Sequence, residues 1–356
     1  MDPFPTADPP KSGCPLKLSD FDYTLPESLI AQHPSDRRDG SRLMVVDRQT
    51  SNIQHCRFSD FGRFVNAGDR LVVNETKVFP ARLRGHKLET GGQVELLLIR
   101  PEKDGRWVAL ARPGRRLKEG ATIIFEEEEV VAIVAGVQED GTRIVQFDGD
   151  VSGLIERRGA IPLPPYIQRD PTESDAERYQ TVYARTAGAI AAPTAGLHFT
   201  GEMLESLESE GVDRTTVLLH VGPGTFKPVE VQDVVNHRMD AEYYEVTDLA
   251  AEEIEKTRAS GGRIVAVGTT SVRVLESQTD TWGRLGSGSG WTDIFIYPGH
   301  SFKLVDALLT NFHLPRSTLL MLVSALAGRE LIREAYDEAV RQEYRFYSYG
   351  DAMLIT

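Results

Sequence analysis

Cysteine is scarce in this sequence: 356 residues contain only two, Cys14 and Cys56. They form no C-x-x-C pair and have no histidine cluster beside them, which argues against a structural zinc site and against a disulfide framework. Such sparing use of cysteine is typical of proteins in a reducing compartment, so we expect a cytoplasmic protein.

Long hydrophobic runs are also missing. The most apolar stretch, residues 319–326, is far shorter than the roughly 20 residues of a membrane-spanning helix. The first residues lack the basic segment and apolar core of a secretory signal. They are rich in proline, and we expect a disordered tail over residues 1–17. The sequence therefore predicts no membrane partner.

Several familiar motifs of nucleotide-binding proteins and hydrolases do not occur. The sequence has no P-loop, no G-x-S-x-G elbow and no complete G-x-G-x-x-G. Gly222-Pro223-Gly224 matches only a fragment of a dinucleotide-binding turn, and no helix pattern follows it. A Rossmann dinucleotide site is therefore not expected.

Positive charge is in deficit, with 40 Lys and Arg against 53 Asp and Glu and a net charge of −13. Such a chain does not hold nucleic acid by charge alone. The distribution is uneven, however. Residues 61–118 carry 13 basic and 6 acidic side chains, whereas residues 119–153 carry 1 and 9. The basic stretch fits selective binding of a folded RNA, and an ordinary solvated surface is the alternative.

Short strand-like segments recur about every ten residues in the first half of the chain, with no helical pattern between them. They lie at 70–73, 93–99, 107–111, 122–125, 130–134 and 143–147. This spacing is typical of a small barrel or sandwich. We expect a β-barrel domain over residues 61–153.

After this region strands and helices alternate, which predicts an α/β layer. We expect helices at 201–210, 247–260, from 269 onward and over most of 318–344, strands at 215–221, 263–268 and 291–297, and a flexible loop at 283–290. The strands at 43–48 and 53–58 need partners from this layer. Residues 18–60 and 154–356 are therefore expected to form one α/β domain that carries the barrel as an insertion, and a monomer is the default expectation.

Two histidines stand beside turns made of small residues. His198 follows Pro193-Thr194-Ala195-Gly196, and His220 precedes Gly222-Pro223-Gly224-Thr225. Glycine lets a ligand approach the backbone closely, and a polar side chain at the end of an apolar strand suits the rim of a pocket. Because imidazole titrates near neutrality, both histidines are candidates for a general base or a hydrogen-bonding anchor. Ordinary turns with core histidines are the alternative.

Residues 268–273 join a buried strand to a helix. The first turn of a helix presents free N–H groups and a positive dipole end, and Thr269 and Thr270 add hydroxyl groups. Arg273 in the same turn opposes the dipole but suits an anion. We expect a carboxylate or phosphate here, although simple capping explains the threonines as well.

Basic and aromatic residues suggest RNA contacts in three places. Lys77, Arg82 and Arg84 lie in the basic stretch, and His313 lies in an aromatic cluster ahead of a helix. Near the carboxyl end, Arg345, Tyr347 and Tyr349 belong to a segment dense in aromatics. Aromatic and arginine side chains stack on bases, but aromatic stripes are more often core.

Taken in order, these segments closely resemble the bacterial S-adenosylmethionine:tRNA ribosyltransferase-isomerases of queuosine biosynthesis. The matching strings are DFDYTLPESLIAQHP (20–34), SRLMVVDR (41–48), NETKVFPARLRG (74–85), IAAPTAGLHFT (190–200), LHVGPGTFKPV (219–229), GRIVAVGTTSVR (262–273), GWTDIFIYPGHSFKLVDALLTNFHLPRSTLLMLVSA (290–325) and YRFYSYGDAMLI (344–355). They extend from about residue 18 to the end. Glu75 and Lys77 stand where the family usually has Asp and Arg.

The resemblance implies a mixed α/β fold with an inserted β-barrel and a site in the cleft between the two domains. It implies that S-adenosylmethionine is a co-substrate that donates its ribosyl group, with no metal and no permanently bound cofactor. The acceptor is the 7-aminomethyl-7-deazaguanine base at the wobble position of tRNAs with GUN anticodons. The transferred group rearranges to give epoxyqueuosine, and adenine and methionine leave.

The resemblance also suggests roles for the candidate residues. His198 or His220 takes or relays a proton, and the two small-residue turns contact adenine. Thr269, Thr270 and Arg273 hold the methionyl carboxylate, while the basic and aromatic residues named above contact tRNA.

Two other functions remain open on the sequence. An S-adenosylmethionine-dependent RNA methyltransferase yields S-adenosylhomocysteine, and the missing glycine fingerprint speaks against it. A non-catalytic tRNA-binding protein retains RNA without turning over S-adenosylmethionine.

Overall fold

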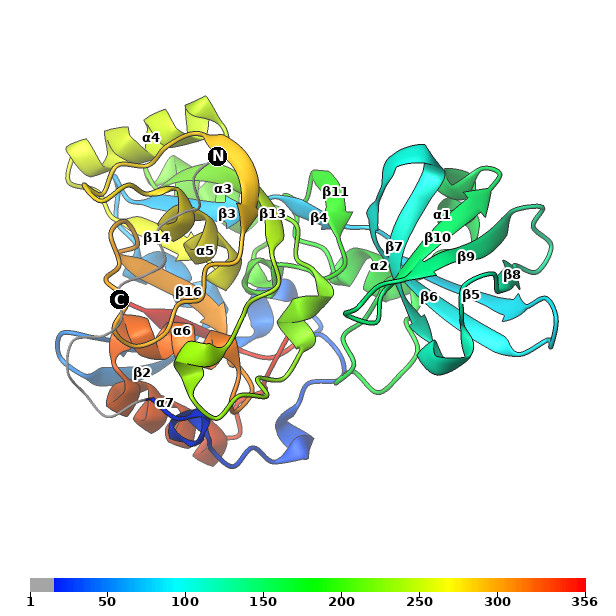
Figure 1. The fold of residues 1–356 in the computed structure, drawn as a ribbon. Helices are drawn as coiled ribbons and strands as arrows, with labels where there is room; N and C mark the ends of the chain where they lie inside the picture. The colour runs from blue at the N-terminus through cyan, green and yellow to red at the C-terminus, as the bar shows by residue number, and fades with distance from the viewer. Residues whose placement is uncertain (1–15) are drawn as a thin grey trace.

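The structure is a computed structural model that describes residues 16–356. A nine-stranded sheet with helices on both faces forms the larger part, and a closed six-stranded β-barrel lies to one side of it (Figure 1). A two-stranded sheet stands between them. The expected mixed α/β fold with an inserted barrel is confirmed.

Four parallel strands form the centre of the large sheet. Across the sheet they are β12 (Asp213–Leu219), β3 (Arg70–Asn74), β14 (Ile264–Val267) and β16 (Ala307–Asn311). Beyond β12 the sheet continues with β13 (Glu242–Val246) and β15 (Gly288–Thr292), and beyond β16 with β17 (Ala352–Ile355), β1 (Arg42–Asp47) and β2 (Asn52–Arg57). Every residue of β3, β14 and β16 is buried, as expected for parallel strands covered on both faces.

Alternate residues of the central strands face two apolar layers. Val72 packs in the layer formed by α4 (Asp248–Ala259), α5 (Thr269–Gln278), α6 (Thr318–Ala327) and α7 (Arg329–Arg341). Its neighbours Leu71 and Val73 face the other layer, which contains α3 (Gly201–Ser209) and the 3-10 helix Phe58–Phe64. The sheet is therefore the middle of three layers.

The barrel has its own core. Its strands follow the order β10, β7, β6, β5, β8 and β9, with bounds β5 (Arg82–Lys87), β6 (Gln93–Pro101), β7 (Arg106–Arg112), β8 (Thr122–Ile124), β9 (Val131–Val137) and β10 (Arg143–Asp148). Leu83, Leu96 and Val134 are among its fully buried residues. The helix α1 (Val151–Arg158) adds Leu154 to this core, and α2 (Glu173–Arg178) lies on the return path to the sheet.

The barrel begins later than residue 61, so the predicted boundary is wrong there. The segment 70–73 is β3, which pairs with β12 and β14 in the large sheet. Its consecutive apolar residues Leu71, Val72 and Val73 suit a strand buried on both faces rather than a barrel strand, in which inward and outward residues alternate. The chain leaves the large sheet through β4 (Thr76–Val78) and returns through β11 (Thr186–Ala189), and these two strands pair in parallel between the domains (Figure 1).

Other boundaries also differ. The strand expected at 291–297 is β15 at 288–292, so it takes in part of the expected loop 283–290. The helical stretch 318–344 is divided at Gly328, whose φ of +85° ends α6. Of the expected tail, residues 1–15 lie outside the described part, and Lys17 forms a bridge to Asp233.

Within residues 16–356, none of the helices combines the length and apolarity that a membrane span requires.

Candidate functional site

A cavity of about 350 Å³ opens at the carboxyl edge of the parallel strands. Val221 follows β12, Gly268 follows β14 and Phe312 follows β16, and all three line the cavity. Ligands of open α/β sheets bind at this edge, and this volume lies within the usual range for small-molecule sites. Further walls come from residues of three loops: Ala191, Ala192, Pro193, Thr194 and Ala195; Thr225, Lys227, Pro228 and Val229; and Tyr347 and Ser348.

The turn from β14 into α5 forms one wall. Gly268 has a φ of +88°, which lets the strand turn directly into a helix that no side chain caps. The first-turn N–H groups of α5 therefore remain available near the cavity. Thr269 and Thr270 line it, and the buried Thr270 hydroxyl has no hydrogen-bond partner among the described residues.

Asn311, the last residue of β16, forms another wall. Its amide nitrogen lies 3.1 Å from the carbonyl oxygen of Tyr347 and 3.2 Å from Nε2 of His198. Both are acceptors for the amide, so the side-chain oxygen Oδ1 is turned away from them. This buried oxygen has no partner within residues 16–356. Buried polar atoms in native proteins are normally hydrogen-bonded, so this unpartnered oxygen of a lining residue is a candidate ligand contact.

His198 lies behind Asn311 and does not line the cavity. Its ring stacks on Phe58, and its Nδ1 lies 2.7 Å from the Ser41 hydroxyl. Burial lowers the pKa of His198 to about 3, aided by Arg345 and Arg38. The ring is therefore neutral at physiological pH, with Nδ1–H donating to Ser41 and Nε2 accepting from Asn311.

His220 lies just outside the cavity, next to the lining residue Val221. Its Nδ1 is 2.8 Å from the Thr76 hydroxyl, and one ring face rests on Gly188. A Cβ at Gly188 would come within 2.5 Å of the ring, so only glycine permits this packing. Desolvation lowers the pKa of His220.

Arg273 does not reach the cavity, contrary to the anion-binding role that the sequence suggested. Its guanidinium pairs with the carboxylate of Glu242, and both side chains are buried. The same carboxylate accepts a hydrogen bond of 2.8 Å from the backbone N–H of Gly222. The pair thus fixes the start of the loop whose later residues Thr225 and Lys227 line the cavity.

The small-residue turns contribute unequally. Pro193, Thr194, Ala195 and Thr225 line the cavity, but the glycines of both turns do not. Gly196 instead leaves room for Tyr183, because a Cβ there would lie 1.9 Å from the phenol oxygen. Gly224 similarly leaves room for Asp240, at 2.6 Å. These glycines serve packing.

Residues 18–355 match the family described as queuosine biosynthesis protein. The chain belongs to this family. It is 54% identical to the S-adenosylmethionine:tRNA ribosyltransferase-isomerases of Symbiobacterium thermophilum and Moorella thermoacetica, over 96% of this chain and the whole of each relative. A crystal structure of S-adenosylmethionine tRNA ribosyltransferase from Thermotoga maritima is 42% identical, with a TM-score of 0.56 over 95% of this chain and all of that one. The chain is accordingly an enzyme of the transferase class.

Three of the residues expected to contact RNA, Lys77, Arg82 and Arg84, lie in the barrel or its link to the large sheet, and two of them are exposed. The exposed Arg84 pairs with Asp170 at 2.5 Å and also lies near Glu95. Arg82 is half-buried and donates to the carbonyl of Leu163. The Lys77 side chain is exposed on β4. Two of the three cations are thus already engaged within the protein.

The expected RNA contacts near the carboxyl end are mostly internal. The Tyr349 hydroxyl donates to Asp175 at 2.6 Å, and Arg345 donates to the carbonyl of His33. His313 and Tyr347 are buried and line the cavity. The aromatic density of this segment therefore belongs mainly to the core and the cavity wall.

Sequence reasoning missed Asn311 as a site residue. The available signal was the one applied to the histidines, a polar side chain that ends an apolar strand. Lys227 was also missed. It lies at the cavity and pairs with Asp240 at 2.6 Å.

The buried histidines predict sensitivity to acid. The pKa values of His198 and His313 are lowered to about 3 by burial, whereas an unfolded histidine titrates near 6.5. Below pH 6.5 the unfolded chain binds the additional protons, so stability falls. Between pH 7.5 and 5.5 we expect a loss on the order of 1 kcal/mol for each histidine, measured by urea unfolding. His313→Gln should reduce this pH dependence, and an unchanged dependence would contradict the assignment.

The buried carboxylate of Asp175 provides a stability test. It accepts from Arg169 at 2.6 and 2.8 Å, from the backbone N–H of Thr172 and from Tyr349. Asp175→Asn should lower the free energy of unfolding by about 3 kcal/mol, because Arg169 loses its partner. Asp170→Asn, at the exposed pair with Arg84, is the control and should cost less than about 1 kcal/mol. Equal losses in urea unfolding would refute the role given to Asp175.

Proposed function

We propose that this enzyme binds S-adenosylmethionine in the cavity and transfers its ribosyl group to the 7-aminomethyl-7-deazaguanine base at the wobble position of tRNA. The group isomerises to give epoxyqueuosine-tRNA, and adenine and methionine are released. The names of the full-length relatives support this reaction. The single observation that carries the proposal is the cavity at the strand edge, whose lining residues Thr270 and Asn311 each hold a buried polar atom without a partner among residues 16–356.

The polar groups of the cavity suit the two ends of this co-substrate. The methionyl carboxylate lies at the start of α5, where free N–H groups and the helix dipole favour an anion and the Thr270 hydroxyl adds a donor. Arg273 does not take part, because Glu242 already neutralises it. An amino group of the co-substrate donates to Oδ1 of Asn311.

In this proposal His198 positions another residue rather than transferring a proton. Both of its ring nitrogens are engaged, and neither faces the cavity. A neutral Nε2 accepts only the amide N–H of Asn311, so it selects the orientation that turns Oδ1 toward the ligand. The relay from Ser41 through His198 to Asn311 therefore fixes an acceptor in the cavity wall.

The reaction can be tested by its products. Enzyme, S-adenosylmethionine and tRNA that carries the aminomethyl precursor should yield adenine, methionine and epoxyqueuosine, identified by mass spectrometry of the nucleosides and by chromatography. tRNA with guanine at the wobble position is the control and should give no modified nucleoside. Formation of S-adenosylhomocysteine would indicate a methyltransferase, and tRNA retention without turnover would indicate a binding protein.

The Asn311 relay can be tested by ligand affinity. Asn311→Ala should weaken S-adenosylmethionine binding about five- to tenfold, because one hydrogen bond is lost. Asn311→Asp should weaken it at least as much, since a carboxylate cannot donate to Tyr347 and His198. Isothermal titration calorimetry measures both, with the exposed Asn236→Ala as the control.

Enzyme kinetics distinguish a positioning role of His198 from a role in proton transfer. His198→Gln should raise the KM for S-adenosylmethionine and leave the pH dependence of kcat unchanged, because His198 does not titrate near neutrality. Loss of a kinetic ionisation near pH 7 in this variant would instead identify His198 as the general base.

A further inference from the structure

A row of ring and guanidinium side chains crosses from the large sheet to the barrel. The His220 ring stacks on Tyr243, with centroids 5.8 Å apart and planes at 24°. Tyr243 contacts Trp291 edge to face at 5.9 Å. The Arg100 guanidinium, from the barrel strand β6, lies 5.9 Å from the centre of the Trp291 ring. We call these four residues the aromatic row.

The backbone holds the aromatic row in place. Tyr243 and Trp291 are directly opposite each other on the antiparallel strands β13 and β15. The N–H of His220 donates to the carbonyl of Tyr243 at 2.9 Å, and Thr76 fixes the His220 ring from the link between the domains. The row is therefore formed before any partner binds, and its position depends on both domains.

The aromatic row is partly open to solvent, and none of its residues belongs to a hydrophobic core of the described part. Trp291 is 55% exposed and Tyr243 is half-buried. The Tyr243–Trp291 pair supports the pairing of β13 with β15, yet more than half of the Trp291 surface stays open to solvent, and a fixed, exposed group of rings suits a surface that binds a partner. The row ends at His220, one residue from Val221 in the cavity wall.

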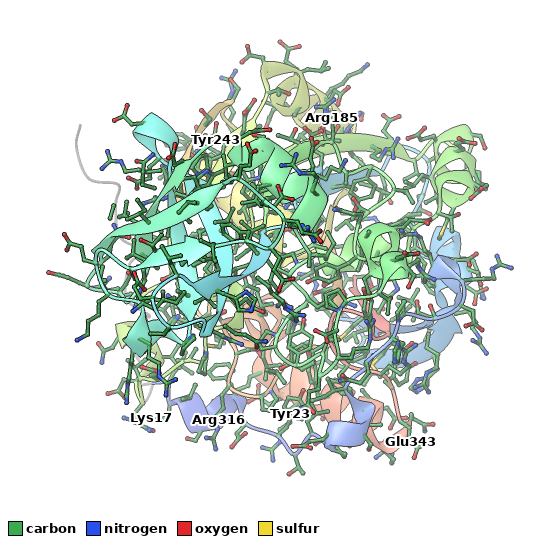
Figure 2. All side chains as sticks on the ribbon, turned by 90° about the vertical axis from the view of Figure 1, so that its right-hand side faces the viewer. Lys17, Tyr23, Arg185, Tyr243, Arg316 and Glu343 are labelled. Carbon is green, nitrogen blue, oxygen red and sulfur yellow. The ribbon has the colours of Figure 1, made fainter. Side chains whose placement is uncertain are left out.

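Cationic side chains lie at both ends of the aromatic row. At the His220 end, Lys77 is exposed next to Thr76, and the side chain of Arg185 is 72% exposed although it pairs with Glu75. Arg100 supplies the charge at the barrel end and also contacts Glu102. Tyr243 and Arg185 both lie in the upper part of the molecule in the view onto the barrel (Figure 2).

One acidic side chain shares a strand face with the row. Glu245, on the same face of β13 as Tyr243, pairs across the sheet with Leu218. Because β12 runs toward the cavity, Glu245 lies farther from the cavity than Tyr243 does. The end of the row that approaches the site therefore carries the exposed Lys77 and the exposed Arg185, whose charge is shared with Glu75.

We propose that the aromatic row is the surface on which the unpaired anticodon loop of tRNA docks. The proposal rests on the function proposed above and adds the docking surface. Unpaired bases stack on aromatic rings and arginine planes, whereas paired bases in a duplex keep their faces covered. Exposed rings with cations at each end match a single strand with its phosphates.

The test measures binding of a fluorescein-labelled, unmodified tRNA transcript by fluorescence anisotropy. Trp291→Ala and Tyr243→Ala should each weaken binding about five- to a hundredfold, the range for loss of one stacked base. Trp291→Phe should retain most of the affinity, because a ring remains. Trp282→Ala, at a tryptophan that is 91% exposed and outside the row, should bind tRNA as the wild type does.

Two further measurements distinguish the possible failures. S-adenosylmethionine binding should be unchanged in Trp291→Ala, which shows that the fold and the cavity are intact. In a chain with Trp107→Phe and Trp282→Phe, the remaining Trp291 fluorescence should be quenched by tRNA and much less by an RNA duplex of similar length. Wild-type tRNA affinity in both alanine variants, or no quenching, would overturn the docking surface while the proposed reaction stands. A wild-type protein that binds no tRNA would overturn both.

Discussion

The side-chain amide of Asn311 is the contact on which the candidate site depends most. It joins the end of β16 to His198 on one side and to the backbone of Tyr347 on the other. These three residues come from separate parts of the chain that all border the cavity. Tyr347 has a φ of +73°, which is costly for a residue with a side chain and is retained where surrounding contacts impose it. The Asn311 amide thus adds to the strand pairing of β17 and the backbone hydrogen bonds that hold the carboxyl-terminal segment, and its Oδ1 is the acceptor proposed for a ligand.

The two domains make different contributions. The large sheet provides the cavity, because its parallel strands end at a common edge where β12, β14 and β16 each pass into a loop or a helix. The barrel reaches the same side of the molecule through Arg100, and the link between the domains holds His220 through Thr76. The proposed reaction brings a small co-substrate and a large RNA acceptor together at one place. The cavity of the large sheet suits the co-substrate, and the aromatic row beside it suits the RNA.

Predictions from the sequence were most successful for features that depend only on neighbouring residues in the chain. The passage from a strand into a helix at Thr269 was expected from the apolar run that precedes it and the hydroxyls that suit a helix start, and both threonines line the cavity. It failed for Arg273, whose charge suggested a ligand. Its actual partner, Glu242, is 31 residues away along the chain. Charge alone identifies no partner, because buried ion pairs form between residues distant in sequence.

The sequence by itself determined the fold class, the inserted barrel and the family, because these follow from the spacing of apolar residues, from turns and from long matching strings. Only the tertiary structure decided that β3 belongs to the large sheet, that His198 supports Asn311 from behind the cavity, and that His220 joins Tyr243 and Trp291 in a row. The physical reason is that burial and hydrogen-bond partners are properties of contacts between distant segments. Whether a histidine binds a ligand at the surface or stays neutral in the core depends on the residues that surround it, and the sequence does not list these.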